Sequence, residues 1–213
     1  MRLAAPLLLI VAAAPLAGCG RAQDPNLNEE QAAAADQRAP NPEKVMAERW
    51  AQIFANPKAV VAAANDFPPF KIDGFKPEKN GFAARGEASY PEKPGAVTIK
   101  ALFDATGATA DKVDSIRYTF DVTHKGQVDQ AAAEIYRYPI RLVNGFLGRF
   151  QVGPGDVINS ALRRRESAKA DLHGTSIVVD AQPIKGGDAK DRHITVTFTR
   201  TGASAPANQT QGK

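Results

Sequence analysis

Strict alternation of apolar and polar residues marks the clearest strand of the chain, over residues 115–123. Its apolar positions are Ile116, Tyr118, Phe120 and Val122, and polar side chains stand between them. This period of two is typical of an antiparallel strand that buries one face and solvates the other. Similar runs bounded by turn residues predict strands over 82–90, 96–103, 175–181 and 193–200. The strand over 82–90 is weakened by Gly86, which has no side chain to pack.

Apolar residues spaced three or four positions apart predict helices before and between these strands. The first helix begins at Asn41-Pro42, because Asn caps a helix and Pro suits its first position. Further helices are predicted over 58–64, 128–136 and 140–150. A last helix has Asp156 as its cap and ends at His173-Gly174. Residues 66–81 predict an irregular segment whose aromatic rings fill the edge of the core.

The order of these elements indicates a single α+β domain over residues 42–200. We expect about five antiparallel strands packed against helices, because all five strands can be linked antiparallel. A polar, alanine-rich stretch, 19–41, precedes the domain and predicts a flexible tether, since it has almost no large apolar side chain to bury. Residues 201–213 predict a disordered tail for the same reason.

The N-terminal residues have the pattern of an export signal. Arg2 supplies a positive start, an apolar run follows it, and the run is too short to span a bilayer comfortably. The stretch Leu16-Ala17-Gly18-Cys19 then resembles the lipobox of bacterial lipoproteins, and the resemblance covers residues 1–19 only. It implies that residues 1–18 are a signal peptide removed before Cys19 and that the Cys19 sulfur carries a diacylglyceryl group. Two alternatives remain open, an ordinary secretory signal that leaves a free thiol and an uncleaved membrane helix.

Composition narrows the classes of function further. Cys19 is the only cysteine of the 213-residue chain, so no disulfide within the chain can form. The formal net charge is 27 − 23 = +4, which is too small to indicate a nucleic-acid partner. Gly20 follows the cysteine, and the absence of Asp there favours the outer membrane under the sorting rule that the lipoprotein resemblance brings with it. The expected location is therefore the bacterial cell envelope, on the periplasmic face of the outer membrane.

Catalytic and metal-binding motifs do not stand out in the sequence. The three histidines, His124, His173 and His193, have no partner at a metal-ligand spacing. Asp188 and Asp191 lie close to His193 and form a possible cation group, but a solvated hairpin tip is the favoured interpretation. The sequence therefore predicts no catalytic residue, no metal and no cofactor, although scattered carboxylates that meet only in the fold stay open.

A basic cluster near residue 164 is the one candidate binding site. Arg163 and Arg164 are predicted to be solvated and to bind an anion such as lipid, lipopolysaccharide or peptidoglycan. The alternative is a solvated helix face with local ion pairs. Arg165 is expected at the core margin, with its stem buried and its head outward. The functional expectation is a lipid-anchored envelope protein that binds or scaffolds. The alternative is a periplasmic enzyme or an accessory subunit of an envelope machine.

Overall fold

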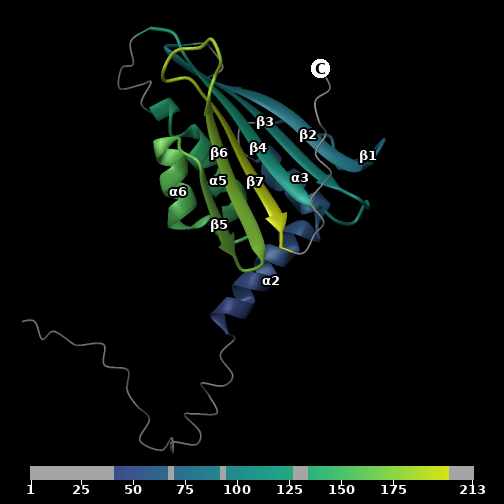
Figure 1. Cartoon of the computed structure of the whole chain (residues 1–213). Helices are drawn as coiled ribbons and strands as arrows, with labels where there is room; N and C mark the ends of the chain where they lie inside the picture. Colours follow the sequence, from purple (N-terminus) through teal and green to yellow (C-terminus); the bar gives the residue numbers. More distant parts are fainter. Residues whose placement is uncertain (1–40, 67–69, 92–94, 127–133, 202–213) are drawn as a thin grey trace, which may run out of the picture. The chain divides into compact units, whose positions relative to one another are not determined.

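The computed structural model describes residues 41–66, 70–91, 95–126 and 134–201 of the chain. Within these residues four helices and a seven-stranded sheet form an α+β domain (Figure 1). The helices are α2 (Pro42–Phe54), α3 (Pro57–Asn65), α5 (Tyr138–Gly148) and α6 (Gly155–Arg164). The strands are β1 (Lys76–Glu78), β2 (Gly81–Tyr90), β3 (Val97–Gly107), β4 (Ser115–His124), β5 (Ala168–Leu172), β6 (Thr175–Pro183) and β7 (Arg192–Arg200). None of the described helices has the length and hydropathy needed to cross a membrane.

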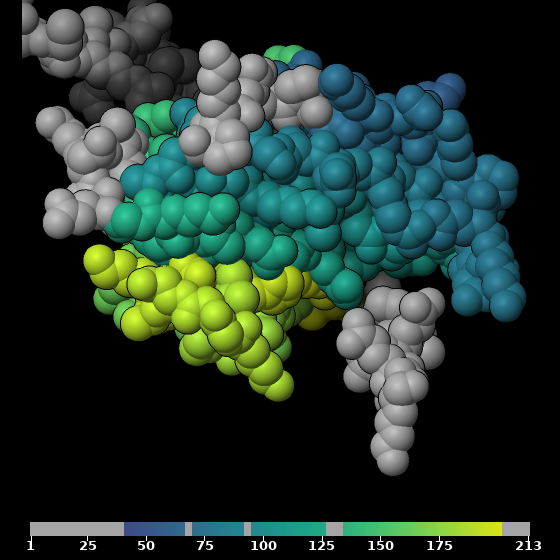
Figure 2. Space-filling view, turned by 90° about the horizontal axis from the view of Figure 1, so that it is seen from above, coloured from purple at the N-terminus to yellow at the C-terminus, as the bar shows by residue number. Residues whose placement is uncertain are grey.

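The strands are all antiparallel and follow the order β1-β2-β3-β4-β7-β6-β5. Strand β4, which has the cleanest alternating pattern, lies in the middle, between β3 and β7. In Figure 2 the yellow residues of β7 lie beside the teal-green residues of β4, with which β7 pairs.

The helices pack on one face of the sheet, behind it in Figure 1. Trp50 of α2 is 1% exposed and its ring lies 6.3 Å from that of Phe198 on β7. On α5, the Phe146 ring lies 5.7 Å from that of Tyr118 on β4. Burial of this apolar face is the main stabilisation of the domain, at about 25 cal/mol per Å² removed from water.

Local chemistry fixes where the first two helices begin. Asn41 accepts a hydrogen bond from the Glu43 backbone N–H at 2.9 Å, and Asn56 accepts one from the Ala59 N–H at 3.0 Å. A proline follows each cap, at the first helical position. The Asn-Pro pair at 41–42 was predicted to start a helix, and that prediction is confirmed.

Seven strands rather than five correct the predicted sheet. The five predicted strands are present, and the other two, β1 and β5, are short and weakly patterned. Residues 168–172 were assigned to the last helix, which instead ends where Arg165 turns to a left-handed conformation with φ 58°. His173 and Gly174 do not stop a helix: both have positive φ, as the two central residues of a type I′ hairpin require, and they join β5 to β6.

Two further predictions about local structure need comment. Asp156 lies in the first turn of α6 but is not its cap, because Pro154 occupies that position and no side chain caps the helix. Much of the predicted helix over 128–136, the tether before residue 41 and most of the tail over 201–213 lie outside the described residues.

Candidate functional site

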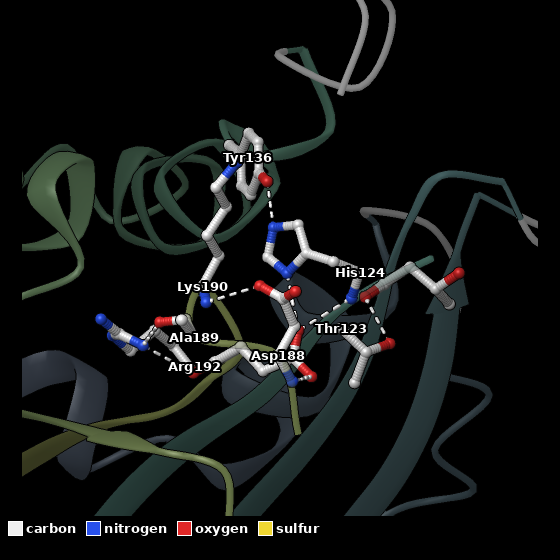
Figure 3. Close-up of polar contacts among 9 residues, drawn as sticks. Thr123, His124, Tyr136, Asp188, Ala189, Lys190 and Arg192 are labelled. Atoms are coloured by element: carbon white, nitrogen blue, oxygen red, sulfur yellow. Dashed lines mark hydrogen bonds and ion pairs between the residues drawn. The ribbon is translucent and has the colours of Figure 1, made fainter. Parts of the chain in front are cut away.

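Four polar side chains from distant parts of the chain meet at one end of the sheet. His124 ends β4, Asp191 lies in the loop between β6 and β7, Tyr136 precedes α5, and Arg165 is the C-terminal cap of α6. In Figure 3 Tyr136 approaches the His124 imidazole from the side of the helices, and Asp188 approaches it from the loop on the other side. We refer to Asp191, His124 and Tyr136 as the triad.

Strand periodicity explains why His124 is buried here. The buried positions of β4 recur at every second residue through Val122, and His124 continues that series at the strand end. Its side chain is 3% exposed. A buried imidazole needs hydrogen-bond partners, and the loop before β7 supplies the first of them.

The Asp191 carboxylate binds His124 through both backbone and side chain. Its Oδ1 accepts hydrogen bonds from the His124 backbone N–H at 2.9 Å and from Nδ1 at 2.7 Å. Its Oδ2 accepts the Asp188 backbone N–H at 2.9 Å. Burial raises the pKa of Asp191, but the hydrogen bonds from His124 and Asp188 outweigh it and hold that pKa below its ordinary value. The group is therefore an ionised acceptor at neutral pH, so Nδ1 of His124 carries a proton.

The other imidazole nitrogen of His124, Nε2, faces the hydroxyl of Tyr136 and forms a hydrogen bond with it. In a neutral imidazole whose Nδ1 carries the proton, Nε2 has a free lone pair and accepts. The Tyr136 hydroxyl is then the donor. The triad is thus a chain of hydrogen bonds that runs from a carboxylate through an imidazole to a hydroxyl.

Arg165 lies over the ring of Tyr136. Its guanidinium carbon is 4.4 Å from the centroid of the Tyr136 ring, which is a cation–π contact. Burial raises the pKa of Tyr136, the Arg165 charge opposes this rise, and the charges of Asp188 and Asp191 add to it. The pKa ends above its ordinary value, so the hydroxyl is protonated at neutral pH. One nitrogen of Arg165, Nη1, is buried and has no hydrogen-bond partner among the described residues.

The loop between β6 and β7 is shaped around the Asp191 carboxylate. A Cβ at Gly187 would lie 2.5 Å from Asp191 Oδ2, so the close approach requires glycine. Arg192 donates from Nη1 to the carbonyl oxygens of Ala189 and Asp191, each at 2.8 Å. These contacts hold the loop so that the carboxylate faces His124.

One group of metal-ligating side chains occurs within the described ranges. Ligand atoms of His124, Asp188 and Asp191 lie within 4.8 Å of one another. However, both Asp191 oxygens accept N–H groups, and Asp188 Oδ1 accepts the Lys190 N–H at 2.9 Å. A cation here would have to replace the hydrogen bond between His124 and Asp191. Internal hydrogen bonds therefore account for this group without a metal.

The predicted grouping of Asp188, Asp191 and His193 is wrong in one member. His193 alternates with buried Ile194 and so lies on the outer face of β7, where its Nδ1 is 2.6 Å from Asp121. His124 takes its place beside the two aspartates. The sequence contained the signal for this, because His124 extends the apolar period of its strand and His193 interrupts that of its own.

The predicted anion-binding residues lie on α6, at its C-terminal end. Arg163 and Arg164 are exposed, as expected, and Arg164 forms an ion pair with Glu166 at 3.0 Å. Arg163 has no ion pair within the part of the chain that the structure describes. Cys19, the predicted lipidation site, lies outside the described residues.

Comparison of the chain with protein-family models, with curated proteins and with solved structures finds no significant match.

Proposed function

We propose that this protein is an exported lipoprotein, anchored through Cys19 in the bacterial envelope with its domain facing the periplasm. The observation that carries this proposal is the stretch Leu16-Ala17-Gly18-Cys19 behind an apolar run. Lipidation gives the lone cysteine a role that a free thiol in an exported protein would lack. Two or more acyl chains anchor stably, because each buried methylene contributes about 0.8 kcal/mol.

Binding or scaffolding is the role that we propose for the domain. The helices cover one face of the sheet, and the other face carries a hollow of about 500 Å³ over β2, β3 and β4. Charged, hydroxyl and apolar groups line it, among them Arg85, Glu87, Leu102, Asp104, Arg117 and Thr119. At the C-terminal end of α6, Arg163 and Arg164 present two further exposed cations. Lipid headgroups, lipopolysaccharide and peptidoglycan carry the anionic groups that arginine side chains bind.

The anchor is tested by mass spectrometry of the full chain expressed in a bacterium. We expect the wild-type protein to begin at Cys19, to carry a diacylglyceryl group and to partition into detergent. The Cys19→Ala variant should stay uncleaved and without acyl chains. A wild-type mass without acyl chains would refute the proposal. A Gly20→Asp variant is the matched control, since it should keep its lipid but shift from the outer to the inner membrane.

A periplasmic enzyme is the second candidate, and one observation favours it. The triad joins a carboxylate, an imidazole and a hydroxyl in the order that nucleophilic enzymes use. A purely scaffolding domain does not need this arrangement at the end of its sheet.

A further inference from the structure

We propose that Tyr136 is a nucleophilic hydroxyl, with His124 as its general base, Asp191 as the positioning residue and Arg165 as an anion contact. The substrate class is an ester that carries a negatively charged group. This inference goes beyond the proposed binding role and does not depend on the lipid anchor.

Geometry is the first support. A hydroxyl becomes a nucleophile when an adjacent base takes its proton and a third group orients that base. Here Nε2 of His124 faces the Tyr136 hydroxyl, and Nδ1 donates to Asp191 at 2.7 Å. The His124 imidazole is therefore held at both ring nitrogens. Its side chain is 3% exposed and that of Asp191 is 7% exposed, so both groups are buried.

The protonation state at rest is the second support, because it defines when the proton moves. Burial keeps the Tyr136 hydroxyl protonated at neutral pH, so no free phenolate waits in the resting protein. The proton must therefore pass to His124 as the hydroxyl attacks. The Arg165 guanidinium lies over the Tyr136 ring, with its carbon 4.4 Å from the ring centroid, and its charge favours negative charge on the phenolic oxygen.

The proposed step balances without a cofactor. The Tyr136 oxygen bonds to the ester carbonyl carbon as its proton moves to Nε2 of His124. The bond to the alcohol oxygen breaks, and the alcohol takes that proton as it leaves. Water then attacks the acyl-tyrosine with His124 as base, which releases the acid and restores the hydroxyl.

Arg165 indicates the charge of the substrate. Its Nη1 is buried and lacks an acceptor among the described residues. An unsatisfied buried donor costs free energy, more so on a charged group. A carboxylate or phosphate oxygen on the substrate would satisfy it. Arg165 also has φ 58°, which ends α6 and directs the chain away from the helix at this position.

The test uses an aryl sulfonyl fluoride with the full chain, as isolated in detergent, followed by peptide mass spectrometry. The tyrosine oxygen displaces fluoride, and the hydroxyl proton goes to the base. We expect Tyr136 to be labelled at least about tenfold faster than Tyr90, which is likewise partly buried. His124→Gln should remove this difference. His193→Gln is the matched control, because it breaks a His–Asp pair of similar length on the outer face and should change nothing.

Equal labelling of Tyr136 and Tyr90 would overturn the proposal, and so would fast labelling that survives His124→Gln. Should that variant fail to fold, the pH profile of the wild type decides. Labelling assisted by a base should level off below the pH range in which tyrosine itself ionises, at about pH 10. A rate that climbs steadily to about pH 11 would instead show unassisted phenolate chemistry and overturn the proposal.

The anion contact has its own experiment, with two chromogenic esters of one alcohol. Mono-4-nitrophenyl succinate should acylate the protein at least about tenfold faster than 4-nitrophenyl acetate. Arg165→Gln should abolish that preference, because it should slow the reaction with the succinate more than the reaction with the acetate. Equal rates with both esters would refute the assignment of an anionic substrate. Because these readouts follow Tyr136 and the anchor test follows Cys19, the two proposals fail independently.

Discussion

Tyr136 and Tyr138 stand two residues apart and illustrate how environment decides what a hydroxyl does. The Tyr136 hydroxyl meets His124, whereas the Tyr138 hydroxyl is buried without a partner among the described residues. Tyr138 is 5% exposed and stacks on Tyr90 with ring centroids 4.5 Å apart. Burial, with a smaller contribution from Tyr90, raises the pKa of Tyr138 to about 12.

Tyr138→Phe should leave the domain as stable as the wild type or more stable at pH 7. The substitution removes an unpaired buried hydroxyl, which costs about 1–3 kcal/mol, and keeps the stacked ring. Because the pKa of Tyr138 is raised in the fold, the folded state favours the protonated hydroxyl. The wild-type domain therefore keeps its stability below the ordinary tyrosine pKa and loses part of it as pH rises toward about 12. The variant should therefore lose less stability than the wild type between about pH 8 and about pH 11. Urea unfolding at both pH values measures this, and an equal alkaline loss would contradict it.

Asp191→Asn should destabilise the domain at neutral pH, by about 1–3 kcal/mol. The pKa of Asp191 is lowered in the fold, so its carboxylate stabilises above the ordinary Asp value and that stabilisation is lost as pH falls. The difference in unfolding free energy between the variant and the wild type should consequently shrink near pH ~3. Asp121→Asn is the control, because Asp121 pairs with His193 at the surface, where such pairs contribute little. Denaturant unfolding across this pH range measures the stability of both variants. An equal effect of the two substitutions would contradict a stabilising role for the buried pair of Asp191 and His124.

The triad escaped sequence-based prediction because its members are far apart in the chain. His124 and Asp191 are 67 residues apart, and only the pairing of β4 with β7 brings them together. Asp191 is itself in a turn, where aspartate is common for local reasons. The orientation of His124 toward the core was nevertheless readable from the period of its strand.

At the scale of helices and strands, the sequence predicted the elements whose apolar residues recur with a clear period. Strands β2, β3, β4, β6 and β7 follow from alternation, and the start of α2 follows from the Asn41-Pro42 cap. Strand β5 was missed because alanine and lysine dominate it, so its alternation carries little hydrophobic contrast and resembles a helix end. Its existence depends on pairing with β6, which is tertiary information.

Gly86 shows how a residue that weakens a strand locally can be required by packing. A Cβ at this position would lie 2.5 Å from the Phe70 carbonyl oxygen and 2.7 Å from Ile72 Cγ1. The segment before β1 therefore crosses β2 at Gly86, and this contact fixes Phe70 against Phe103 with ring centroids 5.9 Å apart. Glycine here is a packing requirement.

Gly86→Ala should accordingly destabilise the domain by about 1–3 kcal/mol, because backbone atoms must shift to admit the methyl group. Gly148→Ala is the matched control: a Cβ there meets nothing within 4 Å, at the last residue of α5. That substitution should be neutral or stabilising by up to about 1 kcal/mol. Thermal unfolding of both variants checks the pair, and a neutral Gly86→Ala would mean that the segment does not press on β2.

At the scale of the whole molecule, the proposed anchor would keep the domain close to a membrane surface. A protein tethered by its N-terminus near a bilayer meets anionic headgroups repeatedly, so even weak cationic contacts act at high local concentration. Arg163 and Arg164 are the exposed cations proposed for such contacts. They also lie in the last turn of α6, where positive charge is favourable to the helix dipole.

Arg163→Gln with Arg164→Gln is therefore a better test than charge reversal, since glutamate at a helix C-terminus would itself destabilise. For the domain from residue 41 onward, binding to vesicles that contain anionic lipid should fall several-fold, while thermal stability shifts by about 0.5 kcal/mol or less. The loss of binding should vanish at about 0.5 M salt, where exposed charges are screened.

The matched control is Arg137→Gln with Arg141→Gln. It makes the same change in charge, but both arginines already pair with Glu134, at 3.0 Å and 2.9 Å. Vesicle co-sedimentation should separate the two variants: both control arginines are paired with Glu134, whereas on α6 Arg164 pairs with Glu166 but Arg163 has no ion pair among the described residues. Equal binding by both would show that α6 carries a solvated face and no specific anion contact.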